Sequence, residues 1–269
     1  MARTQLHLYR FTLALAAAMA GLPVALASAQ PGGPPATSTP SPGSPLRAES
    51  VKASFTLGPD WQPMEAQQLS AFNEGARKVK GGSDVMYDAG YMLVNGQGQL
   101  AAYMLVQTKA GTIASGDVDD LIAAITRGDV ERGAKQVAEQ NKDQFTDLAL
   151  DRPTVDRSTG RIRIPVRAST ADGVLRGISY GHIGGEGLLM LHCYTSLEDF
   201  DALSPRFEAI NASVAFDAGA TYSDALGRSG RARGGSGSSV LQYGIIGAII
   251  GGIGALLFRK KPAPAPPAA

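Results

Sequence analysis

Cysteine is almost absent from this chain of 269 residues, which contains only Cys193. One cysteine cannot close a disulfide within the chain, so the fold must depend on its hydrophobic core. Cys193 lies in the apolar run at residues 188–194. A small buried side chain is therefore the favoured interpretation, because a reactive thiol needs exposure and nearby positive charge.

An excess of charge of one sign is also lacking. The 25 Lys and Arg residues nearly balance the 24 Asp and Glu residues, which leaves a net charge of +1. A nucleic-acid-binding protein needs a basic surplus to displace counterions from phosphates, so we expect no nucleic-acid partner. The 44% hydrophobic content also excludes a chain that is disordered throughout.

Long apolar runs are scarce, and the first lies at residues 11–22, after Arg3 and Arg10. Small residues follow it, so we predict a secretory signal peptide at residues 1–29. An uncleaved anchor is the alternative, but the run is short for a span of about 20 residues. The residues that define the predicted cleavage site are Ala27, Ala29 and Gln30.

The second apolar run, residues 240–258, contains no charged residue. At about 1.5 Å per residue it approaches the thickness of the bilayer hydrocarbon core. We predict a single transmembrane helix here, with the tail at 259–269 in the cytoplasm and the preceding domain outside, in the periplasm. The basic cluster that favours this orientation is Arg259, Lys260 and Lys261. Gly234-Gly235-Ser236 before the run also resembles bacterial C-terminal sorting signals, some of which are cleaved.

Small residues recur at intervals of three and four within this second run. Such spacing lets helix backbones approach closely in lipid, so it predicts self-association or pairing with another membrane helix. The alternative is that glycine is simply common in membrane spans. The small residues are Gly244, Gly247, Ala248, Gly251, Gly252 and Ala255.

Two segments of biased composition bound a domain predicted at residues 51–220. Residues 30–50 are rich in Pro, Ser and Gly, and residues 221–239 are rich in Gly, Ser and Arg. Both compositions are typical of flexible linkers.

Within this domain, helical and strand periodicities alternate along the chain. Helices are predicted at residues 64–79 and 117–141, with Asp129 capping a second piece after Gly128, and from Ser204 onward. Strands are predicted near residues 55–57, 86–94, 100–108, 148–155, 160–169, 174–183, 188–195 and 214–216. This order predicts an α+β fold with a mostly antiparallel sheet flanked by helices.

Residues 161–167 alternate between arginine and aliphatic side chains, except at Pro165. The alternation turns the aliphatic residues inward, and Pro165 suggests a sheet edge or a bulge. The outward arginines could form a basic stripe toward lipid headgroups or an acidic partner, or simply an ordinary solvated sheet face. The arginines of this group are Arg161, Arg163, Arg167 and Arg176.

The search for chemistry centres on His182, His192 and Cys193. A two-residue turn at Gly185-Glu186 would place the two histidines on opposite sheet faces, which disfavours a metal site. A three-residue loop would instead change the register and reopen the question of a metal site. The same register places His182 and Cys193 on one face, as a nucleophile and base would require, but their neighbours are apolar. No phosphate-binding loop or hydrolase motif occurs. We therefore expect no cofactor, no metal and no enzymatic activity.

Two segments resemble the PsbP-like superfamily. Residues 54–61 are similar to its opening strand, which ends at proline and tryptophan, and residues 207–216 are similar to its closing helix and strand. The resemblance implies a non-catalytic module for binding or assembly, and no site residue is transferred with it.

These observations lead to three hypotheses of function. The first is a non-catalytic, membrane-anchored envelope protein whose extracytoplasmic domain binds or helps assemble a partner. The second is an envelope enzyme that uses His182 and Cys193. The third is a stress-response module, or one that binds anionic lipid surfaces through its arginines.

Overall fold

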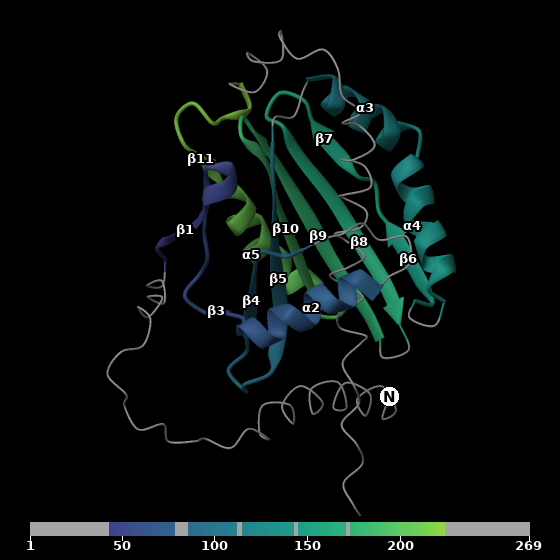
Figure 1. Cartoon of the computed structure of the whole chain (residues 1–269). Helices are drawn as coiled ribbons and strands as arrows, with labels where there is room; N and C mark the ends of the chain where they lie inside the picture. Colours follow the sequence, from purple (N-terminus) through teal and green to yellow (C-terminus); the bar gives the residue numbers. More distant parts are fainter. Residues whose placement is uncertain (1–42, 79–85, 112–114, 143–144, 171–172, 224–269) are drawn as a thin grey trace, which may run out of the picture.

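The computed structural model describes residues 43–78, 86–111, 115–142, 145–170 and 173–223 (Figure 1). The predicted signal peptide at 1–29, the apolar run at 240–258 with its small residues, and the basic tail at 259–269 lie outside these residues. Among the described helices, none has the length and apolar character needed to cross a membrane.

An eight-stranded antiparallel sheet forms the centre of the domain, in the order β3-β4-β5-β10-β9-β8-β6, with β7 also paired to β8. Its strands are β3 (Trp61–Pro63), β4 (Ala89–Val94), β5 (Leu100–Ala110), β6 (Asp147–Leu150), β7 (Thr154–Asp156), β8 (Arg161–Thr170), β9 (Gly173–Gly184) and β10 (Gly187–Ser196). A smaller sheet contains β1 (Pro45–Ala48), β2 (Ala53–Thr56) and β11 (Ala215–Phe216), and the short helix η1 (Glu49–Val51) joins β1 to β2.

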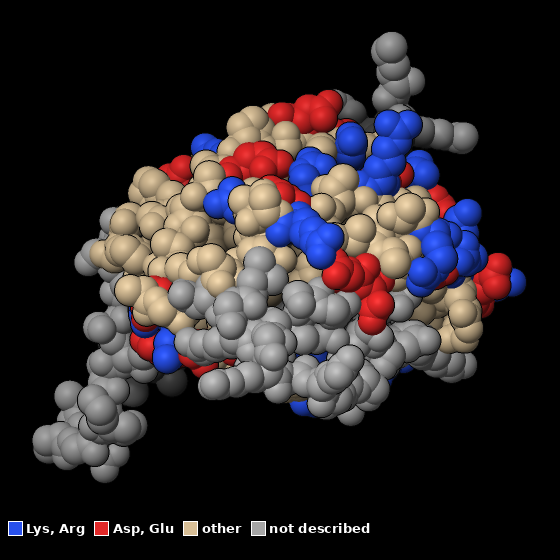
Figure 2. All heavy atoms as spheres, turned by 90° about the horizontal axis from the view of Figure 1, so that it is seen from above, with Lys and Arg blue, Asp and Glu red and all other residues tan. Residues whose placement is uncertain are grey.

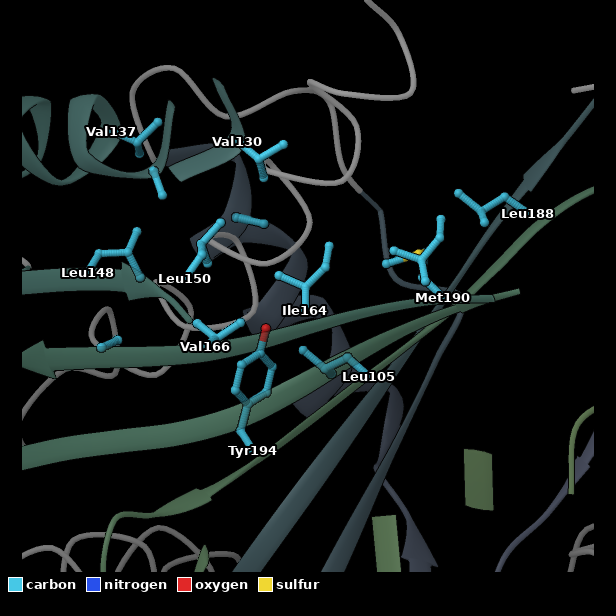
Figure 3. Packing of buried hydrophobic residues seen from close by; sticks show 14 of the residues in the cluster. Leu105, Val130, Val137, Leu148, Leu150, Ile164, Val166, Leu188, Met190 and Tyr194 are labelled. Carbon is cyan, nitrogen blue, oxygen red and sulfur yellow. The ribbon is translucent and has the colours of Figure 1, made fainter. Parts of the chain in front are cut away.

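Helices cover both faces of the large sheet (Figure 1). The helices α2 (Ala66–Lys78), α3 (Ser115–Thr126) and α4 (Asp129–Gln140) pack against one face. In Figure 3, Val130 and Val137 of α4 lie above the strand residues Leu148, Leu150 and Val166. Helix α5 (Phe200–Ala212) and the small sheet cover the other face. The α+β prediction with a mostly antiparallel sheet is confirmed.

The register of the β9–β10 hairpin was predicted correctly. Gly185 and Glu186 form a two-residue turn, so that Ile183 pairs with Leu188 and His182 pairs with Leu189. Because side chains alternate along a strand, this register decides which face every residue of the hairpin occupies.

The start of α5 was predicted wrongly, because the helix begins at Phe200 rather than at Ser204. Pro205 lies inside the helix and cannot donate a backbone hydrogen bond to the Asp201 carbonyl. The Ser204 hydroxyl donates to that carbonyl instead, over 3.5 Å. Proline in a sequence does not by itself distinguish the first turn of a helix from the second.

The cap of α4 also differs from the prediction. Gly128, with φ of 68°, occupies the N-cap position, and Asp129 is the first residue of the helix. The Asp129 carboxylate forms ion pairs with Arg127 and Arg132 rather than capping the helix. Its negative charge still lies in the first turn, where the helix dipole favours it.

The predicted strand at 148–155 is divided into β6 and β7, and Pro165 of β8 lies opposite the break. The Asp151 amide donates to the Pro165 carbonyl over 2.9 Å. The backbone nitrogen of Pro165 therefore faces the break rather than β9. β8 is paired on both sides and is no edge strand, so the proline is accommodated by the interruption of its neighbours.

The domain extends beyond both predicted boundaries. β1 and the first two residues of η1 lie within the 30–50 segment predicted to be a linker. At the other end, Tyr222, within the predicted tether at 221–239, is buried in the core beside Gly160.

Gly177 of β9 lies beneath the ring of Tyr194, and a Cβ atom there would collide with that ring and with the Cys193 carbonyl oxygen. We expect Gly177→Ala to lower the free energy of unfolding by about 1–3 kcal/mol, because overpacking displaces neighbouring atoms. The measurement is the urea midpoint. Gly96→Ala is the control, because nothing lies within 4 Å of a Cβ at Gly96. Equal midpoints for the two variants would contradict the expectation.

Candidate functional site

Helix α5 positions the polar side chains of the sheet face that it covers, which we call the α5 face. Phe207, which is fully buried, and Ile210 anchor the helix over β9 and β10. The neighbouring strand β8 alternates as predicted, with Ile162 and Ile164 buried toward the other helices. Its arginines therefore project on the α5 face, beside the helix.

A group of polar residues lies where α5 meets β8 and β9. The Arg163 guanidinium donates to the Glu208 carboxylate over 3.3 Å, and the Asn211 amide donates to the same carboxylate over 3.3 Å. Tyr180 and His182 lie on the same face, directly opposite Arg163 and Arg161. We call this group the α5 polar cluster; its members are Arg161, Arg163, Tyr180, His182, Glu208 and Asn211.

Burial controls the protonation of His182 and Tyr180 within this cluster. His182 is 3% exposed, and burial, together with the positive charge of Arg161, lowers its pKa to about 4. Burial also raises the pKa of Tyr180 far above its usual value, and Glu208 adds to this effect. Glu208 and Asn211 thus influence these side chains, although Tyr180 Oη and His182 Nε2 make no hydrogen bond of normal geometry within the described residues. Both groups are neutral at pH 7.

His182 and Cys193 lie on the same face, as predicted, but they do not form a nucleophile and base. Cys193 pairs with Ile178, and His182 pairs with Leu189, two positions of that face away along the hairpin. Cys193 is fully buried, and burial raises the pKa of its thiol well above the usual range. A thiolate nucleophile needs the opposite conditions, namely exposure and a lowered pKa.

His192 lies on the opposite face of the sheet from His182, which confirms the prediction that the two histidines do not converge. Its Nδ1 atom is 2.9 Å from the Ser179 hydroxyl, and the ring of Tyr87 lies edge-on to it, with centroids 5.9 Å apart. Complete burial lowers the pKa of His192 to about 3. No three metal-ligating side chains come together in the described parts of the chain.

The four predicted arginines share the α5 face, and three of them lie near acidic residues whose proximity could not be predicted from the sequence. Arg163 reaches Glu208, Arg167 lies 3.4 Å from Asp147, and Arg176 lies 3.8 Å from Asp201. Such exposed pairs contribute little to stability. We call Arg161, Arg163, Arg167 and Arg176 the arginine face. Figure 2, which views the molecule from above, shows basic and acidic side chains interspersed on that face.

A groove of about 460 Å³ lies at the other end of α5, between the helix and the β4–β5 turn. Leu93, Ala101 and Leu203 supply apolar surface, and Arg206 forms an ion pair with Asp60 over 3.1 Å. The sequence predicted the strands near 86–94 and 100–108 on either side of this turn but not the groove, because only the tertiary fold brings Leu203 to the turn.

Solved structures of other proteins are similar to this chain in fold. No protein-family model matches the chain, and no curated protein matches it. A cyanobacterial PsbP from Synechocystis sp. PCC 6803 is similar over 71% of this chain and 99% of its own, with 12% identity and a TM-score of 0.41. LpqN of Mycobacterium tuberculosis, which is involved in cell envelope biogenesis, is similar over 64% and 84% respectively, with 10% identity and a TM-score of 0.34. A PsbP structure is thus among those similar to the chain, and at these scores the likeness carries no inference about activity.

Proposed function

We propose that this chain is a non-catalytic, membrane-anchored envelope protein whose extracytoplasmic domain binds a partner through its α5 face. The observation that carries the proposal is the burial of the reactive groups. Each of the three reactive side chains, Cys193, His182 and His192, is at most 3% exposed. Burial raises the pKa of the thiol and lowers the pKa values of the imidazoles, so all three are neutral at pH 7. The α5 face, by contrast, presents a groove and arginines at the surface.

The anchor rests on the sequence. An apolar run at 240–258 follows the domain, a basic cluster ends the run, and a signal peptide is predicted at 1–29. Deleting residues 240–258 should move the protein from the membrane fraction to the soluble periplasmic fraction. Full-length mature protein that is freely soluble after fractionation would contradict this part of the proposal.

Partner binding is tested by a photo-crosslinking amino acid placed in the full chain, in its native envelope. A crosslinker at Leu203, in the groove, should give a discrete crosslinked product. The matched position is Glu139 of α4, a helix that packs against the opposite sheet face. Equal crosslinking from both positions, or none from Leu203, would contradict partner binding at the α5 face.

The non-catalytic role makes a separate prediction for the buried residues. Cys193→Ser should lower the melting temperature, because a polar hydroxyl replaces a buried thiol, without abolishing the crosslink from Leu203. An enzyme that used Cys193 would instead lose function at a temperature where the variant remains folded. The measurements are thermal unfolding and crosslinking yield on the same preparation.

A further inference from the structure

Arg167 of β8 and Arg176 of β9 are paired directly across the antiparallel ladder. The hydrogen bond from the Asp151 amide to the Pro165 carbonyl shows that Pro165 turns its polar backbone atoms away from β9. Arg167 lies two residues further along the strand, so its backbone N–H and C=O groups also point away from β9. Arg167 and Arg176 are thus a non-hydrogen-bonded pair, in which the Cβ atoms lie about 4.5–5.5 Å apart.

This pair is locally unfavourable, because like charges directly opposite each other destabilise a sheet. The nearby acids compensate weakly, since the side chains of Asp147 and Asp201 are 52% and 94% exposed and lie 3.4 and 3.8 Å from the arginines. Arg176 is also held in place, with its guanidinium carbon 4.2 Å from the centre of the Phe200 ring. A sequence that breaks a local rule often does so at a functional site.

We propose that Arg167 and Arg176 form a binding site for a phosphate group, which bridges the two guanidinium groups. This rests on the proposed function and names the chemistry that a ligand presents to the α5 face. A tetrahedral phosphate offers an edge of two oxygens to each guanidinium. A carboxylate offers a single edge, and Asp147 and Asp201 already supply one carboxylate near each arginine. The phosphate belongs either to a soluble ester or to an anionic lipid headgroup.

The test uses the full chain in micelles of a neutral detergent. Inorganic phosphate is titrated into this sample, and calorimetry measures the heat of binding. Chloride keeps the ionic strength constant throughout the titration. The wild-type protein should bind saturably, and Arg167→Gln/Arg176→Gln should weaken binding at least ten-fold. The control is Arg127→Gln/Arg132→Gln, which removes the same charge from the α3–α4 side of the molecule and should leave the affinity unchanged. Equal weakening in both double variants, or in neither, would overturn the site.

A second arm replaces inorganic phosphate with micelles that contain phosphatidylglycerol. Binding in this arm alone assigns the site to a lipid headgroup, and binding of inorganic phosphate alone assigns it to a soluble ester. Either result must disappear in Arg167→Gln/Arg176→Gln to support the site. No binding in either arm would overturn it.

The melting temperature and the crosslinking yield distinguish failure of the phosphate site from unfolding and from failure of the proposed function. In chloride, Arg167→Gln/Arg176→Gln should melt at or above the wild-type temperature because the repulsion is removed, so a lost phosphate response would not reflect unfolding. The crosslink from Leu203 tests the proposed function independently. If that crosslink fails while phosphate binding depends on the two arginines, the proposed function falls and the phosphate site stands.

Discussion

Lowering the pH from 7 to 4 should reduce the free energy of unfolding by about 3 kcal/mol for each of His182 and His192. Both are buried, and their folded-state pKa values of about 4 and about 3 lie below the ordinary value of 6.5. The unfolded chain therefore binds more protons below pH 6.5. Stability is complete above that pH and is lost as the pH falls toward the folded-state values. A loss of about 6 kcal/mol is a large part of the stability of an ordinary domain.

Urea unfolding measured between pH 7 and pH 4 checks this expectation. His182→Gln/His192→Gln should be less stable than the wild type at pH 7, because His192 loses its contact with Ser179, yet it should lose much less stability on acidification. The carboxylates with lowered pKa values, Asp156 and Asp217, lose most of their stabilising effect below about pH 4, near their ordinary pKa of 3.8, so they contribute little within this window. A double variant with the full wild-type pH dependence would show that the histidines are not its source.

Much of the fold could be predicted because the spacing of hydrophobic residues and the residue types in turns are local properties of the sequence. The glycine-rich segment at Gly185-Glu186 allowed a two-residue turn, and this turn, which the structure contains, places His182 and His192 on opposite faces. The alternation around Ile162 and Ile164 likewise predicted which side of β8 is buried. These inferences needed no knowledge of distant parts of the chain.

The candidate site could be predicted only in part, because it depends on contacts between residues far apart in the sequence. Glu208 and Asn211 meet β8 and β9 only because α5 folds back over the sheet. The pairing of Arg167 with Arg176 required the register of two long strands, which was predicted for the β9–β10 hairpin but not for β8. The groove beside Leu203 required both the β4–β5 turn and the docking of α5.

Phe207→Ala should lower the free energy of unfolding by about 3–5 kcal/mol, the usual cost of removing a fully buried phenylalanine. The side chain is completely buried, and its ring lies 6.4 Å from the ring of Trp61. Urea unfolding at pH 7 measures the loss. The control is Leu203→Ala on the same helix, which is only partly buried and should cost much less.

The same variant tests whether α5 holds the α5 face together. If Phe207 is the anchor, hydrogen exchange in Phe207→Ala should increase more in α5 than in β8, because the helix contacts the sheet through a few side chains while β8 is paired on both sides. The crosslink from Leu203 should then weaken, since the groove exists only while the helix is docked. Unchanged exchange in α5 would show that Ile210 and the ion pairs to Arg163 and Asp60 suffice to hold the helix.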